Sequence, residues 1–186
     1  MKEGSGSAAI MEIEELVLRK PTLQDVTGLL NIKNNEKAAL LLGGVFHVYT
    51  SEDIIKWIQF HNSNPNEKLF VIENKYTKAL IGHAGLYKID SVARKTEYGI
   101  LIADDNSRGK GYGTKCTRTM VDYAFKELGM HKVTAEVLCE NYPSLMMFKK
   151  CGFSIDGCLR DDVYKNNRYY NVYSLSVLKD EISIND

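Results

Sequence analysis

Residues 106–116 read NSRGKGYGTKC, with glycines at 109, 111 and 113 and basic residues at 108 and 110. An apolar run, YGILIA at 98–103, precedes this stretch, and apolar positions at helical spacing follow it up to Gly129. This order predicts a strand-to-helix junction. The first amides of a helix have no partner within it, and the helix dipole adds positive charge there, so phosphate binds readily. Glycines let the backbone approach a ligand without an intervening Cβ.

The glycine spacing excludes the two common nucleotide fingerprints. The Walker pattern GxxxxGK[ST] is absent, and the dinucleotide pattern GxGxxG is replaced by GxGxG at 109–113. A solvated glycine-rich turn is the simpler alternative, but the helix that follows favours a phosphate-binding junction. The stretch therefore predicts a phosphate cradle of another kind.

Composition limits the chain to one domain and few kinds of partner. Its 186 residues are 44% hydrophobic and 26% charged, which suits a single domain with a substantial core. Residues 1–11 are rich in Gly, Ser and Ala and are expected to form a flexible head, which leaves 12–186 as the domain. Lys plus Arg and Asp plus Glu number 24 each, and this balance argues against nucleic acid or an anionic membrane as a partner. No apolar stretch nears the roughly 20 residues of a membrane-spanning helix, and no signal peptide is recognisable, so a soluble cytoplasmic protein is expected.

The cysteines give no sign of a metal or redox site. They form no CxxC pair and have no accompanying histidine at ligand spacing. Reduced thiols in a cytoplasmic protein are therefore expected at Cys116, Cys139, Cys151 and Cys158.

The apolar periodicity predicts alternating strands and helices around the glycine stretch. A strand at 16–18 ends before Pro21, and Thr22 and Ser51 are expected to cap two helices. The loop at 40–50 between these helices could close over a ligand. Further strands are expected at 68–74, 79–90, 95–103 and 131–139, and in two segments within 154–178 joined by a turn at 165–168. Helices are expected at 22–35, 51–63, 113–130 and 141–153.

The glycine stretch resembles a known family. Residues 108–113, RGKGYG, match Arg/Gln-x-x-Gly-x-Gly/Ala, the acetyl-CoA pyrophosphate loop of the GNAT superfamily of N-acetyltransferases. The segments 96–113, 139–153 and 157–178 resemble the family's central strand and loop, its Asn-to-Gly-Phe segment and its closing hairpin. Within the superfamily the chain is most similar to the branch of ribosomal-protein alanine, spermidine and amino-sugar N-acetyltransferases. The resemblance implies a mixed α/β fold with a twisted, splayed, mostly antiparallel sheet of about seven strands and helices on both faces.

The resemblance also implies how acetyl-CoA is held as acetyl donor, with no metal. Main-chain groups of Leu101 and Ile102 would bind the pantetheine arm, and Asn141 would lie beside the cofactor. Lys149 or its neighbour Lys150 could reach the nucleotide phosphate, although two lysines at a helix end are more often solvated. Backbone amides would hold the pyrophosphate, with added charge from Lys110; these are the amides of Arg108, Gly109, Lys110, Gly111, Tyr112, Gly113 and Thr114.

Catalysis requires a base for the ammonium group of the acceptor and support for the leaving thiolate. Glu97 is the best candidate for the base, acting through water, although a surface carboxylate on an alternating strand is as good a description. Many related enzymes carry a tyrosine as general acid where this chain has Phe148, which has no proton to donate. Ser144 and Tyr164 are the first and second substitutes; they could equally be a helix-cap hydroxyl and a strand aromatic.

The acceptor is the least determined part of the reaction. Few acids lie in the segments expected to face it, mainly Glu52, Asp53 and Glu67, so polyamines are disfavoured. Aromatic and polar side chains suit a sugar or a peptide end instead, and these are His47, Tyr49, Trp57, His61 and Asn62.

The leading hypothesis is therefore transfer of acetyl from acetyl-CoA, by direct attack, to a primary amine of a small molecule, an amino sugar first. The alternatives are a protein N-terminus such as that of a ribosomal protein, a polyamine, and a CoA-binding domain without catalysis. The aromatic strand at 169–175 could pair two copies of the chain into a homodimer.

Overall fold

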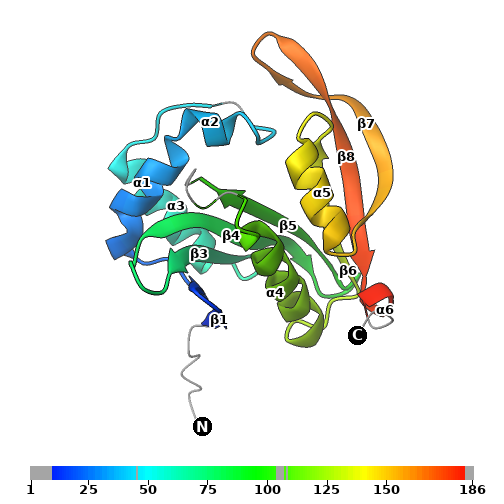
Figure 1. Cartoon of the computed structure of the whole chain (residues 1–186), viewed down its shortest axis with the longest axis horizontal. Helices are drawn as coiled ribbons and strands as arrows, with labels where there is room; N and C mark the ends of the chain where they lie inside the picture. Colours follow the sequence, from blue (N-terminus) through cyan, green and yellow to red (C-terminus); the bar gives the residue numbers. More distant parts are fainter. Residues whose placement is uncertain (1–9, 45, 104–106, 108, 183–186) are drawn as a thin grey trace.

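One open sheet organises the chain (Figure 1). The computed structural model describes residues 10–44, 46–103, 107 and 109–182. Within these residues eight strands lie in the order β1-β2-β3-β4-β5-β6-β8-β7. The strands are β1 Met11–Ile13, β2 Leu16–Arg19, β3 Lys68–Asn74, β4 Leu80–Asp90, β5 Lys95–Ile102, β6 Lys132–Leu138, β7 Ser154–Lys165 and β8 Arg168–Leu178. The helices are η1 Leu23–Asp25, α1 Val26–Lys33, α2 Glu36–Ala39, α3 Ser51–Ser63, α4 Tyr112–Lys126, α5 Tyr142–Lys150 and α6 Lys179–Ile182.

The sheet is antiparallel except between β5 and β6, which run parallel. These two strands pair only where Lys95–Glu97 lies opposite Lys132–Thr134, and their remaining described residues are not paired with each other. The expected mixed, splayed, mostly antiparallel sheet is confirmed. Its opening lies between the ends of β5 and β6.

Helices cover both faces of the sheet, as expected. In Figure 1, α4 lies in front of the sheet and α3 behind it. On the α3 side, Leu29 of α1 and Ile54 of α3 pack against Val71 of β3. On the α4 side, Met120 packs with Phe70 and other inward residues of the central strands. No helix within the described ranges is long and apolar enough to span a bilayer.

Several local expectations are corrected. Met11, assigned to the head, is the first residue of β1 and pairs with Leu18, which gives the sheet its eighth strand. The helix expected at 22–35 is divided into η1 and α1, and the short α2 follows. Thr50 rather than Ser51 caps α3, because the hydroxyl of Thr50 accepts the amide of Asp53 at 3.2 Å and completes a capping box.

The aromatic strand at 169–175 is paired on both sides over residues 172–175, and among the described strands Tyr169 and Tyr170 are paired with β7 alone. It belongs to β8, which is hydrogen-bonded to β6 on one side and to β7 on the other. The described pairings do not test the expected homodimer, which stays a prediction. The edge strand at this end of the described sheet is β7.

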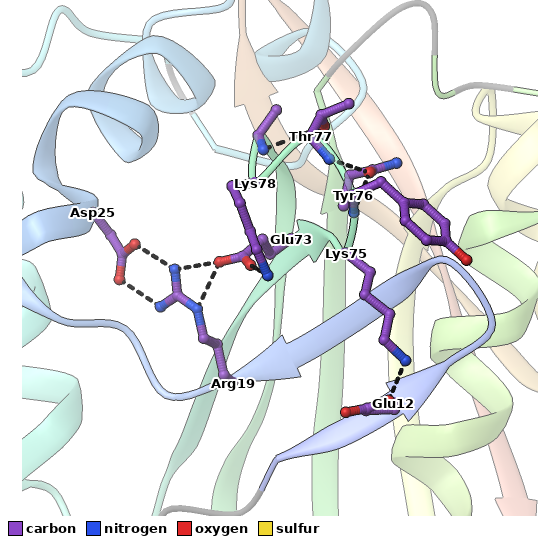
Figure 2. Close-up of polar contacts among 10 residues, drawn as sticks. Glu12, Arg19, Asp25, Glu73, Lys75, Tyr76, Thr77 and Lys78 are labelled. Atoms are coloured by element: carbon purple, nitrogen blue, oxygen red, sulfur yellow. Dashed lines mark hydrogen bonds and ion pairs between the residues drawn. The ribbon is translucent and has the colours of Figure 1, made fainter.

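An ionic cluster fixes the start of η1 to the sheet (Figure 2). Arg19 of β2 donates from Nε to Glu73 of β3 at 2.8 Å and from both terminal nitrogens to Asp25, at 2.9 and 2.7 Å. Both carboxylates are buried, with Asp25 6% and Glu73 7% exposed. Burial works to raise the pKa of Asp25, but the hydrogen bonds from Arg19 and Thr22 outweigh it and hold the pKa below its ordinary value. The guanidinium therefore compensates two buried charges at once.

Candidate active site

A cavity of about 660 Å³ occupies the opening between β5 and β6. Four parts of the chain form its walls: residues 98–102 of β5, residues 136–138 of β6, the glycine stretch with the start of α4, and α5. Leu41–Gly43 close one side of it. The loop after α2, expected to lie over a ligand, thus does contribute to the cavity wall.

The glycine stretch forms the predicted strand-to-helix junction. Gly109 and Gly111 have φ of 74° and 79°, a left-handed conformation in which glycine alone is unstrained, and Gly111 directly precedes α4. The first hydrogen bond of the helix runs from the amide of Lys115 to the carbonyl of Gly111 at 3.0 Å. The amides of Tyr112, Gly113 and Thr114 precede it, and all three residues line the cavity. The backbone can therefore present amides to an anion, as the sequence predicts.

Two basic residues of the glycine stretch are not seen at the cavity. Arg108 lies outside the described residues. Lys110 is exposed and absent from the cavity wall, and its Nζ lies 6.0 Å from the ring centroid of Tyr112. Within the described part of the junction, the positive charge at the cavity wall therefore comes from the backbone amides.

The main-chain groups of β5 point alternately toward β4 and toward β6. A Cβ added to Gly82 of β4 would lie 2.0 Å from the carbonyl oxygen of Leu101, so that carbonyl points toward β4 and away from the opening. Main-chain groups alternate in direction along an antiparallel strand, so those of Ile100 and Ile102 point toward β6. Ile100, Leu101 and Ile102 all line the cavity, and the binding of a pantetheine arm by Leu101 and Ile102 stays a prediction.

The start of α5 combines a cap and a cross-link. The side-chain oxygen of Asn141 accepts the amide of Ser144 at 3.2 Å, which caps α5. Its side-chain nitrogen donates to the carbonyl of Leu41 at 2.9 Å and so ties α5 to the loop after α2. Asn141 and Ser144 both line the cavity, as does Lys150, whereas Lys149 does not.

The position of the missing tyrosine is deeply packed. Phe148 lines the cavity and contacts the rings of Tyr98 and Phe153, with centroids 6.1 and 4.9 Å apart. The hydroxyl of Tyr98 is buried and lies 3.2 Å from the hydroxyl of Thr117. Burial raises the pKa of Tyr98 well above its ordinary value, so this hydroxyl is a poor proton donor. Of the polar candidates named from the sequence, Ser144 is the one hydroxyl that the structure brings to Phe148.

Glu97 and Tyr164 do not reach the cavity. The carboxylate of Glu97 lies 2.7 Å from Nζ of Lys88, and its side chain is not part of the cavity wall. A register shift between Tyr87 and Asp90 places Lys88 beside it. Tyr164 is exposed on β7 and packs against Tyr169 with ring centroids 4.8 Å apart.

A lysine that the sequence did not single out closes the cavity from outside. Lys165, at the end of β7, is buried and donates from Nζ to the carbonyls of Leu40 and Leu42 at 2.8 and 2.5 Å. Together with Asn141 it holds the loop of residues 40–42 across the opening. A lysine in a hairpin turn carries no sequence signal for such a contact.

The aromatic and polar residues proposed for the acceptor lie mainly on the α3 side of the sheet. The rings of His47 and Tyr49 are 4.0 Å apart, those of Trp57 and His61 are 4.8 Å apart, and His61 pairs with Glu67. Asn62 differs, because its side chain donates to the carbonyl of Pro21 at 2.9 Å and holds the chain before η1. The side chain of Asn62 thus stabilises the fold.

Comparison with known proteins identifies the family of this chain. The spermidine N(1)-acetyltransferase of Vibrio cholerae is 29% identical over 166 residues, which cover 89% of this chain and 94% of that protein. A ribosomal N-acetyltransferase-like protein of Bacillus subtilis is 34% identical over 106 residues, 57% of each chain. The crystal structure of the Vibrio cholerae spermidine N-acetyltransferase with CoA and spermine superposes with a TM-score of 0.82 at 26% identity, covering 91% of this chain and 98% of that one.

The sequence model of the acetyltransferase (GNAT) domain matches residues 15–154. That range runs from β2 to the start of β7 and contains the glycine junction and the opening of the sheet. Since it spans well over half of the chain, the protein belongs to the GNAT family and is an acyltransferase that takes its acetyl group from acetyl-CoA.

Proposed function

We propose that the protein transfers the acetyl group of acetyl-CoA to a primary amine of a small molecule. The observation that carries this proposal is that one continuous cavity joins the start of α4 to the opening between β5 and β6. One end offers helix amides to a diphosphate, and the other offers strand main chain to an extended arm. A long ligand with both parts fits such a cavity.

Residues of this chain would hold acetyl-CoA along that path. Amides of Tyr112, Gly113 and Thr114 would bind the pyrophosphate, and main-chain groups on the β6 side of Ile100 and Ile102 would bind the pantetheine arm. Lys150, at the cavity wall, is better placed than Lys149 for the nucleotide phosphate. The bound thioester supplies an activated acetyl group near the end of β5.

The remaining chemistry concerns protons. As the amine nitrogen bonds to the acetyl carbon, the carbon–sulfur bond breaks, CoA leaves as thiolate, and the ammonium proton must go to a base. Glu97 is the proposed base, and it would act through water because it is not part of the cavity wall. Ser144, at the cavity wall next to Phe148, is the proposed proton donor for the thiolate.

A polyamine acceptor is the second candidate. It is favoured by the spermidine N-acetyltransferase of Vibrio cholerae, whose structure contains spermine and superposes with a TM-score of 0.82. The charge of Lys33 on the α3 side of the sheet favours a different acceptor.

Thiol release measured with acetyl-CoA and a panel of amines tests the proposal, with calorimetry of acetyl-CoA binding beside it. We expect binding and turnover of at least one small amine. Binding without turnover of any amine would favour a domain that only binds CoA. No binding at all would contradict both.

Replacing Glu97 by glutamine is expected to lower kcat/KM about tenfold. This is less than a base in direct contact supplies, because a water must carry the proton. Lys88→Gln is the matched control, since it removes the same 2.7 Å ion pair and keeps the carboxylate. A kcat/KM for Glu97→Gln equal to that of Lys88→Gln would exclude Glu97 as the base.

Replacing Lys165 by methionine is expected to raise the dissociation constant for acetyl-CoA about fivefold, measured by calorimetry. Two hydrogen bonds from a buried ammonium to Leu40 and Leu42 are lost, and the loop then opens more often. Lys56→Met removes a lysine from an exposed pair with Glu52 on α3 and should leave the constant unchanged. Equal constants for both variants would show that the loop does not support the cavity.

A further inference from the structure

A second, smaller cavity adjoins the first on the α3 side of the sheet. Its volume is about 110 Å³, several times the roughly 30 Å³ that one liquid water occupies. Leu42 and Leu101 line both cavities, so the small one begins where the large one reaches the end of β5. Whatever occupies it lies next to the acetyl group of a donor bound as proposed above.

The wall of the small cavity contains a cation. Lys33, the last residue of α1, lines it together with His47 and Tyr49. Nζ of Lys33 lies 4.1 Å from the ring centroid of Trp57 and 5.5 Å from that of Tyr49. Among the described residues no carboxylate forms an ion pair or a hydrogen bond with it. Burial lowers the pKa of Lys33 to about 8, which still leaves it largely charged at neutral pH.

The surroundings hold this lysine in place. The side-chain amide of Asn34 donates to the carbonyl of Tyr49 at 3.0 Å and accepts its backbone amide at 2.8 Å. Tyr49 is therefore fixed beside Lys33. The indole of Trp57 is packed in turn against His83, with centroids 5.3 Å apart. The cation thus lies in a preformed aromatic setting.

His83 is a buried polar residue in contact with Trp57, near the wall of the small cavity. It is opposite Leu101 in the pairing of β4 with β5, and neither of its ring nitrogens has a partner within the described chain. Burial, with further contributions from Lys33 and His61, lowers the pKa of His83 to about 3, so the ring is neutral. It brings no negative charge to this region, and it is not part of the lining of either cavity.

Three described carboxylates on this side are already engaged. Glu67 pairs with His61, Glu97 with Lys88, and Asp53 accepts the amide and hydroxyl of Thr50. A polyamine would bring a second ammonium group toward Lys33 and find no open carboxylate among these three. Like charges at short range in a partly desolvated site repel strongly.

We propose that the acceptor carries an anionic group, a carboxylate or a phosphate, beside its amine, and that Lys33 binds this group in the small cavity. Its amine then lies toward Leu101 and the acetyl donor. Lys33 is thereby a residue that determines specificity. This inference rests on the proposed function, because it names the class of acceptor for that reaction.

Matched pairs of acceptors test the proposal on the unaltered protein. Thiol release is measured for glucosamine against glucosamine 6-phosphate, for propylamine against β-alanine, and for spermidine. At least one anionic member should have a kcat/KM about tenfold or more above its neutral partner and above spermidine. Which pair shows the larger ratio distinguishes phosphate from carboxylate.

Variants of Lys33 locate the effect. Lys33→Met should bring the ratio within the responsive pair close to one, chiefly through KM, while Lys33→Arg should keep most of it. Lys37→Met, which removes an exposed lysine four residues along, should leave the ratio as it was. Melting temperatures of all variants show that they are folded.

The outcomes are separable. A preference for spermidine, or equal rates within both pairs, would overturn the inference and leave the proposed function standing. A folded Lys33→Met variant that keeps the ratio of kcat/KM within the responsive pair would also overturn the inference and leave the proposed function standing. Turnover of none of these amines, despite acetyl-CoA binding, would contradict the proposed function and this inference with it.

Discussion

Replacing Gly111 by valine is expected to raise the dissociation constant for acetyl-CoA about 100-fold, or about 2.7 kcal/mol. The residue before α4 has a φ of 79°, which a β-branched side chain does not tolerate without strain. Apart from its chain neighbours, no atom of the described residues lies within 4 Å of a Cβ added at Gly111, so the cost is in the backbone and not in crowding. The junction would relax by rotating the amides of Tyr112, Gly113 and Thr114 away from the cavity. Losing one or two hydrogen bonds to a charged phosphate accounts for the expected effect.

Gly129→Val is the matched control for this prediction. Gly129 also has a positive φ, 65°, but it lies beyond the other end of α4 and not at the cavity. Its replacement should lower the melting temperature and leave the dissociation constant unchanged. Calorimetry with acetyl-CoA alone, without acceptor, measures the dissociation constants of both variants. An unaltered constant in a folded Gly111→Val protein would show that the junction does not bind the pyrophosphate.

Replacing Arg19 by methionine is expected to lower the free energy of unfolding by about 3–5 kcal/mol at neutral pH, because two buried carboxylates lose their shared partner. The loss should be read from urea denaturation. Arg168→Met is the control, since its ion pair with Glu140 is exposed on both sides and should contribute about 1 kcal/mol or less. A loss for Arg19→Met no larger than that of Arg168→Met would mean that the cluster in Figure 2 does not hold η1 to the sheet.

The same cluster predicts a dependence on pH. The folded-state pKa of Asp25 is below its ordinary 3.8, so its contribution is present above that value and is lost as the pH falls through the folded pKa. The difference between the unaltered protein and Arg19→Met should therefore shrink below about pH 4. A difference as large at pH 3 as at pH 7 would contradict this assignment.

Local features of the fold could be predicted from the sequence because they depend on nearby residues. Gly109 and Gly111 are needed where the backbone turns with positive φ, and that need is visible in their spacing. The capping residues lie within three positions of the amides they bind, so the region of a cap is predictable even where Thr50 replaced Ser51.

The walls of the cavity could not be predicted in the same way. Lys165 binds carbonyls about 125 residues earlier in the chain, and a lysine in a turn looks the same whether it is solvated or buried. Lys33 ends a helix, where a solvated cation is the usual case, and it is partly buried because Trp57 and Tyr49, from a later part of the chain, pack against it. A register shift near Lys88 gave Glu97 a partner that strict alternation along the strands does not predict.

The short contact between β5 and β6 has a mechanical consequence. Among the described residues, three strand pairs of β5 and β6 join the half of the sheet that contains β1 to β5 with the half that contains β6 to β8. Each half has its own long antiparallel pairings, whereas the core side chains on the α4 side are shared by both halves. The loop of residues 40–42, which is hydrogen-bonded to Lys165 and Asn141, adds a second connection at the open end. An acetyl donor seated in the opening would touch both halves, so the cooperativity of unfolding itself would depend on whether substrate is bound.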